Sequence, residues 1–267
     1  MTHLTPRHNI SIALIVLYTP TLLLSIHLTI RHGLSRSSGW RFLLTFSLAR
    51  LLAASFDLAT IAHPSNISLY IGEWVLLGIA LSPLELVSLG FISRVLASIA
   101  KSGKQTLLTP RHVQLVQLAN TVGLALAIAG GVRAGNDVGA NGGRIQVSTL
   151  TEAAVGLFIA SFAAIVVAAG LTWRDVRCAE DGEKRLLGAV AATAPFLLVR
   201  VVYTALSVFG GGMRFNPVQG DVWYLLGMAL IMELVIVYVF LGVGMTLKKI
   251  EKGEGEVEMQ AKNASAA

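Results

Sequence analysis

The chain has 267 residues, of which only 13% are charged, whereas a soluble domain usually carries about 25%. Hydrophobic residues make up 54% of the chain, and its mean hydropathy is +0.70. So few charges cannot cover the surface of a soluble globule of 28.3 kDa. The composition therefore excludes a soluble enzyme and predicts an integral membrane protein whose main partner is the lipid bilayer.

Several kinds of site are excluded by what the sequence lacks. Cys178 is the only cysteine, so neither an internal disulfide nor a cysteine-rich metal site can form. The six histidines are scattered without paired metal-binding spacing, and no glycine-rich phosphate loop follows a strand. The net charge of +6 is spread over short segments between apolar stretches, which does not indicate nucleic-acid binding. We expect no metal and no cofactor.

Seven apolar runs are long enough to cross about 30 Å of hydrocarbon, which takes roughly 20 residues. The fourth run is the most polar, because it contains Gln114, Gln117 and Asn120, so we expect an interior helix there. The sequence predicts an all-α, seven-helix transmembrane bundle over residues 10–247, after a short N-terminus (1–9) and before a disordered, charged tail (248–267). The expected spans are 10–30, 42–61, 70–98, 113–132, 148–172, 186–209 and 222–247.

The direction of the chain follows from its basic residues, because loops rich in Lys and Arg stay in the cytoplasm. The N-terminus and the segments after the second, fourth and sixth spans hold only Arg7, Arg133, Arg144 and Arg214. The N-terminus is therefore predicted to be outside or lumenal and the tail cytoplasmic. The segments after the other spans hold Arg31, Arg36, Arg41, Lys101, Lys104, Arg111, Arg174, Arg177, Lys184, Arg185, Lys248, Lys249, Lys252 and Lys262.

Two sequons agree with this direction. Asn9-Ile10-Ser11 and Asn66-Ile67-Ser68 both fall on the predicted outer side, where N-glycosylation takes place. Asn9 and Asn66 are therefore candidate glycosylation sites. The sequence does not distinguish the endoplasmic reticulum from the plasma membrane.

Four charged residues are predicted to lie within roughly 4 Å of the membrane midplane, given a rise of 1.5 Å per residue. They are Arg50, Glu85, Arg200 and Glu233. Charges at this depth cost several kcal/mol unless they are paired. Adjacent helices favour the pairs Arg50 with Glu85 and Arg200 with Glu233. They are either buried ion pairs that fix helix register or ligand contacts.

The two halves of the chain share a pattern around these charges. Phe46 to Arg50 and Phe196 to Arg200 both read F-x-L-x-R, 150 positions apart. The tripeptide that begins at Glu85 recurs at Glu233. These matches indicate two three-helix units joined by the fourth span, an arrangement known in transporters.

A second group of acidic residues is predicted nearer the outer face, with Asp57 the deepest of them and Glu73 further out. A carboxylic acid in a desolvated pocket can stay protonated at neutral pH and act as a general acid. Asp57, Glu73 and Glu85 are therefore the candidate catalytic acids. The other candidate pocket residues are Arg50, Trp74, Arg200, Tyr203, Trp223 and Glu233, the aromatic ones being either cation-π partners or an interfacial belt.

The most distinctive motifs are Gly39-Trp40-Arg41, Ser82-Pro83-Leu84-Glu85, Arg200-Val201-Val202-Tyr203, Phe215-Asn216-Pro217 and Leu226-Gly227-Met228 leading to Glu233. With these, the chain resembles a family of uncharacterised fungal seven-transmembrane proteins, over nearly all of the membrane region. The resemblance implies fungal origin and seven helices but no known activity. In size and helix number alone, the chain is also similar to fungal membrane-bound terpene cyclases.

Three functions are consistent with these features. The first is a membrane protein that handles a small, largely hydrophobic molecule in an intramembrane pocket, as a cofactor-free, proton-initiated cyclase or isomerase of fungal secondary metabolism. The second is a small-molecule transporter with a three-plus-one-plus-three helix repeat. The third is a seven-helix receptor, which rests on helix number and direction alone.

Overall fold

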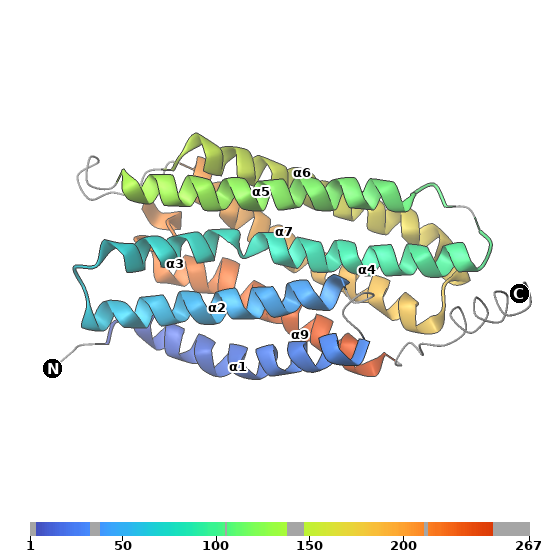
Figure 1. Cartoon of the computed structure of the whole chain (residues 1–267), viewed down its shortest axis with the longest axis horizontal. Helices are drawn as coiled ribbons and strands as arrows, with labels where there is room; N and C mark the ends of the chain where they lie inside the picture. The colour runs from blue at the N-terminus through green and yellow to red at the C-terminus, as the bar shows by residue number, and fades with distance from the viewer. Residues whose placement is uncertain (1–3, 33–37, 105, 138–146, 211–212, 248–267) are drawn as a thin grey trace, which may run out of the picture.

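The long helices run roughly side by side along one axis of the molecule (Figure 1). The computed structural model describes residues 4–32, 38–104, 106–137, 147–210 and 213–247. Within these ranges there are seven helical segments that are long and apolar enough to cross a bilayer. The prediction of an all-α, seven-span protein is confirmed, and the chain is an integral, multi-pass membrane protein. The predicted tail, residues 248–267, lies outside the described residues.

The third and seventh spans are each built from more than one segment, and short 3₁₀ turns follow two of the long helices. The first helix begins at Pro6, four residues before the position expected from hydropathy. The elements are α1 (Pro6–His32), α2 (Ser38–Ala62), α3 (Ile67–Ile79), α4 (Leu81–Lys101), α5 (Pro110–Asn136), α6 (Thr149–Asp175), η1 (Val176–Cys178), α7 (Asp181–Phe209), η2 (Met213–Phe215), α8 (Val222–Leu225), the π-helical segment η3 (Leu226–Leu230) and α9 (Ile231–Thr246).

The same four residues, Thr-Pro-Arg-His, stand at the start of two helices. They are residues 5–8 at the start of α1 and residues 109–112 at the start of α5. Proline suits the first helical position because its missing N–H has no partner there anyway. The backbone N–H of Thr5 donates to Nδ1 of His8 (3.3 Å), and the same bond joins Thr109 and His112 (3.3 Å). This is a capping box with histidine in the place of glutamate. It occupies Nδ1 of each imidazole and leaves Nε2 free to face another group.

The third span is interrupted at Ala80, between α3 and α4. Pro83 causes the break, because its ring displaces the carbonyl four residues earlier and it has no N–H to donate. Close to the break, Leu77 O of α3 accepts a hydrogen bond from Arg200 Nη2 of α7 (3.0 Å).

Helix α4 is the centre of the bundle, since it contacts α2, α5, α6 and α7, and its residues from Leu81 to Ile92 are all buried. A row of aromatic rings packs beside it. Trp40 lies 4.8 Å from Phe91, which in turn lies 5.1 Å from Phe240, measured between ring centroids. Gly244 of α9 lets the backbone approach the Trp40 ring so closely that a Cβ there would overlap it.

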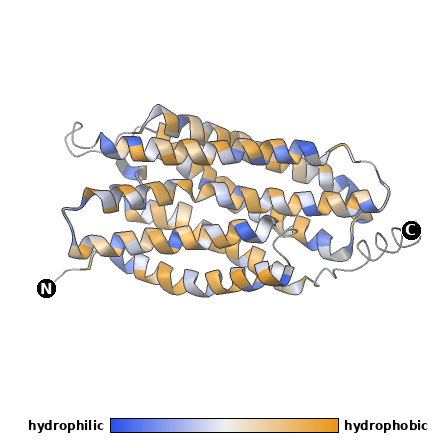
Figure 2. Ribbon diagram, in the orientation of Figure 1, coloured by the Kyte–Doolittle hydropathy of each residue, from blue (hydrophilic) through white to orange (hydrophobic). Residues whose placement is uncertain are grey.

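Hydrophilic residues gather toward the two ends of the helices, and apolar residues cover most of their length (Figure 2). Large apolar side chains also point away from the protein, including Val16 and Leu23 of α1 and Leu118 of α5. In water such a surface would drive aggregation, whereas in a bilayer it faces lipid chains. The surface therefore fits the same solvent as the composition.

Ion pairs between described residues lie at the end of the bundle that the basic residues assign to the cytoplasm. Arg94 of α4 contacts Glu183 of α7 (2.6 Å), and Lys104 contacts Asp175 of α6 (2.7 Å). The hydrogen bond from Lys104 to Asp175 raises the pKa of that lysine above its ordinary value. These pairs join the helices at this end, although the exposed one contributes little stability.

Both candidate glycosylation sites are exposed at the opposite end. Asn9 lies within the first turns of α1. Asn66 caps α3, where its Oδ1 accepts a hydrogen bond from the backbone N–H of Ser68 (3.1 Å). This cap uses the oxygen and not the amide nitrogen to which a glycan attaches, so capping and glycosylation of Asn66 are compatible. Glycosylation at both sites stays a prediction.

The direction of the chain can be tested with its single native cysteine. Cys178 is free and exposed at the end of the bundle assigned to the cytoplasm. In sealed cells or right-side-out vesicles, we expect a membrane-impermeant maleimide to label Cys178 only after permeabilisation. A Cys178→Ala, Asn66→Cys variant should be labelled without it. The opposite pattern would reverse the predicted orientation.

A glycine pair on α9 tests the packing of Trp40. Gly244→Ala adds a methyl group against the buried Trp40 ring, so we expect a loss of about 1–3 kcal/mol in the free energy of unfolding. Gly242→Ala is the matched control, because no atom lies within 4 Å of a Cβ at that position. The control should be neutral or slightly stabilising, since alanine has the higher helix propensity. Thermal unfolding in detergent, read out by tryptophan fluorescence, measures both; equal effects would contradict this packing.

Candidate ligand-binding site

Three charged side chains from three helices meet in the middle of the bundle. Arg200 Nε of α7 donates to Glu233 Oε1 of α9 at 2.5 Å, and Arg50 Nη2 of α2 donates to the same oxygen. All three side chains are buried, with at most 3% of each exposed. Two guanidinium groups therefore share one carboxylate, and these three residues form a central triad with a net charge of +1.

The two arginines of the triad differ in how well they are satisfied. Arg200 also donates to Thr204 Oγ1 and to Leu77 O, and its guanidinium lies 5.7 Å from the centre of the Tyr203 ring. Arg50 lies 5.7 Å from the Phe46 ring. Its Nε and Nη1 have no hydrogen-bond partner within the part of the chain that the structure describes. Arg50 is therefore the arginine with donors to spare.

The expected pair of Arg50 with Glu85 is wrong, whereas the expected pair of Arg200 with Glu233 is present. Glu85 of α4 instead accepts a hydrogen bond from Asn120 Nδ2 of α5, which also contacts Ser161 of α6 (3.2 Å). Position along the chain gave the correct depth for Arg50 and Glu85 but not the rotation of their helices. Glu85 faces α5 and α6, away from Arg50.

A cavity of about 330 Å³, called the vestibule below, lies at the end of the bundle where α1 begins. It lies between α1, α2 and α3, with the segment before α8 contributing one residue. Five of its lining residues are ionisable. The lining comprises Thr5, Arg7, His8, Asp57, Thr60, Ile61, Pro64, Tyr70, Glu73 and Val218.

Asp57 is the deepest acid of the vestibule and is held from two sides by α1. Ser11 Oγ donates to Asp57 Oδ2 at 2.6 Å, and His8 Nε2 lies 4.0 Å from Asp57 Oδ1. Because the helix cap occupies Nδ1 of His8 as an acceptor, the ring proton sits on Nε2 and faces the carboxylate. Asp57, His8 and Ser11 together form a polar cluster on the vestibule wall.

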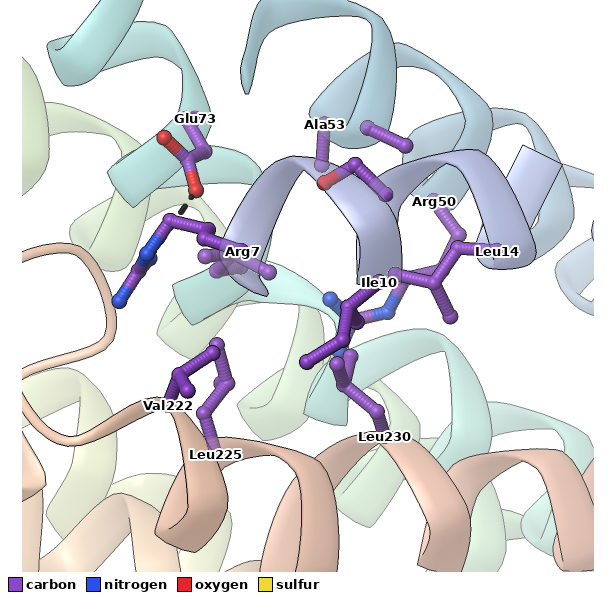
Figure 3. Close-up of a pocket in the computed structure, with 12 residues that line it drawn as sticks. Arg7, Ile10, Leu14, Arg50, Ala53, Glu73, Val222, Leu225 and Leu230 are labelled. Carbon is purple, nitrogen blue, oxygen red and sulfur yellow. Dashed lines mark hydrogen bonds and ion pairs between the residues drawn. The ribbon is translucent and has the colours of Figure 1, made fainter. Parts of the chain in front are cut away.

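Glu73 and Arg7 separate the vestibule from a second, smaller cavity. Arg7 Nη1 lies 3.3 Å from Glu73 Oε1 and donates to Pro217 O at 2.6 Å. Both residues line the vestibule and also a cavity of about 20 Å³, called the inner cavity below. Figure 3 shows this inner cavity, with the Arg7–Glu73 contact at one side and Arg50 at another. Its lining is Arg7, Ile10, Ser11, Leu14, Arg50, Ala53, Ala54, Glu73, Leu77, Val222, Leu225 and Leu230.

The structure thus divides the site residues expected from the sequence. Asp57 and Glu73 line the vestibule, and Glu73 and Arg50 line the inner cavity. The other six expected residues are in the lining of neither cavity: Trp74, Glu85, Arg200, Tyr203, Trp223 and Glu233. Trp74 packs beside Gly131 of α5, Tyr203 packs against Phe215, and Trp223 is 68% exposed. The three charged residues are buried. Among the described residues, no group of three or more His, Cys, Asp or Glu side chains is arranged to hold a metal ion.

One protein-family model matches the part of the chain that forms both cavities and the triad. The model described as "Domain of unknown function (DUF7702)" matches residues 4–250. The chain belongs to this family. No curated protein and no solved structure matches the chain. The family thus spans all seven helices without assigning an activity to them, and fungal origin stays a prediction.

Sequence reasoning missed Arg7, His8 and Ser11, which complete the walls of the two cavities. Arg7 was counted as a loop charge because the first span was expected to begin at residue 10. One signal was present in the sequence: Thr5-Pro6 is a typical helix start, and it would have extended the helix through Arg7. Asn120 was recognised as unusual for a membrane span, but its partner Glu85 was not.

Substitution of the two central carboxylates distinguishes their roles. Glu233→Gln leaves two buried guanidiniums without a counter-charge, so we expect a loss of about 3–5 kcal/mol in the free energy of unfolding. Glu85→Gln keeps an oxygen for Asn120 and should cost about 1 kcal/mol or less. Denaturant unfolding of the purified variants in detergent measures both. An Arg50–Glu85 pair would instead make Glu85→Gln the more damaging change.

Proposed function

We propose that this protein binds a small molecule in the vestibule, with a polar part of the molecule against Asp57 and Glu73. The observation that carries the proposal is the cavity of about 330 Å³ lined by these two acids, Arg7 and His8. This volume is in the range of small-molecule sites, roughly 300–1,000 Å³. Ile61 and Val218 offer apolar contact to the rest of the ligand.

The size of the cavities favours a ligand with a polar end over a purely hydrophobic one. The inner cavity, at about 20 Å³, has room for one water-sized sphere. A hydrophobic molecule held entirely at the level of the triad therefore has no matching space in this conformation. The vestibule has the space, and its wall is mixed, with charged groups beside Pro64 and Tyr70.

A proton-initiated cyclase or isomerase is the enzymatic form of this proposal. It assigns proton donation to Asp57 or Glu73, because these two candidate acids line the vestibule and Glu85 does not. Cation-π stabilisation of a positively charged intermediate has less support, since Tyr70 is the one aromatic residue in the vestibule lining. Ligand binding without chemistry needs fewer groups, and the geometry supports it better.

Transport is a second candidate, favoured by the order of the two cavities. The vestibule, the Arg7–Glu73 contact, the inner cavity and the central triad follow one another toward the middle of the bundle. In this proposal the Arg7–Glu73 ion pair is a gate between the two cavities, and the gate opens when one of the two residues changes its contact. The receptor interpretation has no comparable observation in its favour.

Capture of a ligand during purification tests the proposal. We expect native mass spectrometry of the protein, extracted in mild detergent from its source cells, to show a bound small molecule. Asp57→Asn and Glu73→Gln should each reduce its occupancy at least about tenfold, because each removes a charged contact that is worth roughly 1.5–3 kcal/mol.

The control for capture is Glu152→Gln. Glu152 is an acid in the first turn of α6 and is not part of the vestibule lining. Its substitution should leave the occupancy unchanged. The same occupancy in all three variants would place the ligand elsewhere and overturn the proposal.

A further inference from the structure

Arg50 is the starting point for a second site, which does not depend on the ligand of the vestibule. Its side chain is 1% exposed, and it has one hydrogen-bonded partner, Glu233. The Nε and Nη1 groups are buried and find no partner among the described residues. Buried guanidinium N–H groups without an acceptor cost free energy of the order of several kcal/mol.

These donors belong to a side chain that lines the inner cavity. Figure 3 shows the Arg50 guanidinium among Ile10, Leu14 and Leu230, between the start of α1 and the turn where α8 leads into α9. The cavity volume of about 20 Å³ matches one water molecule or one monatomic ion. Most of the remaining wall is apolar. Its one acid, Glu73, contacts Arg7 through Oε1, and no hydrogen bond joins it to Arg50 among the described residues.

Charge decides between these two occupants. Glu233 carries one negative charge for both Arg50 and Arg200, which leaves one positive charge in the triad without compensation. Glu73, the acid in the lining of the inner cavity, already has Arg7 as its partner, and Asp57, which lines the vestibule instead, is held by Ser11 and His8. A water molecule would satisfy the free N–H groups but leave the net charge. A monovalent anion satisfies both.

We propose that the inner cavity is a binding site for a small monovalent anion of the chloride class, held by Arg50. The anion accepts hydrogen bonds from the free N–H groups of Arg50 and brings the central triad to neutrality. Because the Arg7–Glu73 contact lies between the inner cavity and the vestibule, the anion enters when that contact opens. The triad with its anion is then electrically neutral at the depth where charge is most costly.

The test compares chloride with gluconate at constant ionic strength, because gluconate is too large for the inner cavity. The protein is purified in nanodiscs of zwitterionic lipid, and its thermal unfolding is followed between 1 and 300 mM chloride. We expect the unfolding temperature to rise by about 4 °C for each tenfold increase in chloride above the dissociation constant. Equal unfolding temperatures in the two salts would overturn the proposal.

Two variants with matched controls locate the effect. Arg50→Gln removes the donors while Arg200 still pairs with Glu233, and Ala54→Val fills the cavity without changing any charge. Both should lose the dependence on chloride, whatever their own stability. Arg174→Gln and Ala160→Val, at exposed positions on α6, should keep it. If Arg50→Gln does not fold, Ala54→Val alone decides the test. If the unfolding temperature of Ala54→Val still depends on chloride, the proposal is overturned.

Crystals of the wild-type protein grown with bromide give a direct readout. We expect an anomalous scattering peak within about 3.5 Å of the Arg50 guanidinium, at hydrogen-bond distance for a halide. Water alone in the inner cavity, with no anomalous peak there, would reject the anion. This readout and the capture experiment are independent, so the anion site and the vestibule ligand succeed or fail separately.

Discussion

One carboxylate binds two guanidinium groups at a depth where none of the three can reach water. A lone charge at this depth costs at least a few kcal/mol, so Glu233 constrains where α2 and α7 can lie relative to α9. The break between α3 and α4 adds a fourth element, because Leu77 O accepts from Arg200. The triad therefore joins the N-terminal and C-terminal halves of the chain through a contact that hydrophobic packing, which has no direction, does not provide.

Much of this architecture was predictable because it depends on quantities that run along the chain. The seven spans follow from the length of apolar runs, and the common depth of Arg50, Arg200 and Glu233 follows from a fixed rise per residue. The rotation of a helix whose surface is apolar all round is not encoded in this way. For this reason the partner of Arg200 was predicted correctly, while Glu85 was assigned to Arg50 instead of Asn120. The cavities depend on such rotations and on side-chain packing, so they too were beyond the sequence.

The vestibule exists because α1 begins earlier than its hydropathy indicates. The first helical turn places Arg7 and His8 beside Asp57 of α2 and Glu73 of α3. The basic groups of the vestibule are thus supplied by a helix start, and the acidic ones by the neighbouring helices. The inner cavity begins where the first turns of α1 meet α8 and the π-helical segment η3, which contribute Leu225 and Leu230 to its wall. π-Helical turns of this kind are frequent at functional sites.

The Thr-Pro-Arg-His cap occurs at the start of two helices that run in opposite directions through the bundle (Figure 1). In both copies the threonine N–H donates to Nδ1 of the histidine, and in the second copy the Thr109 hydroxyl contacts Nδ1 as well (2.8 Å). At α1 the free Nε2 faces Asp57, whereas His112 at α5 is exposed at the far end of the molecule. The chain therefore presents the same four residues in two surroundings, once against the acids of the vestibule and once in the open at the far end of the molecule.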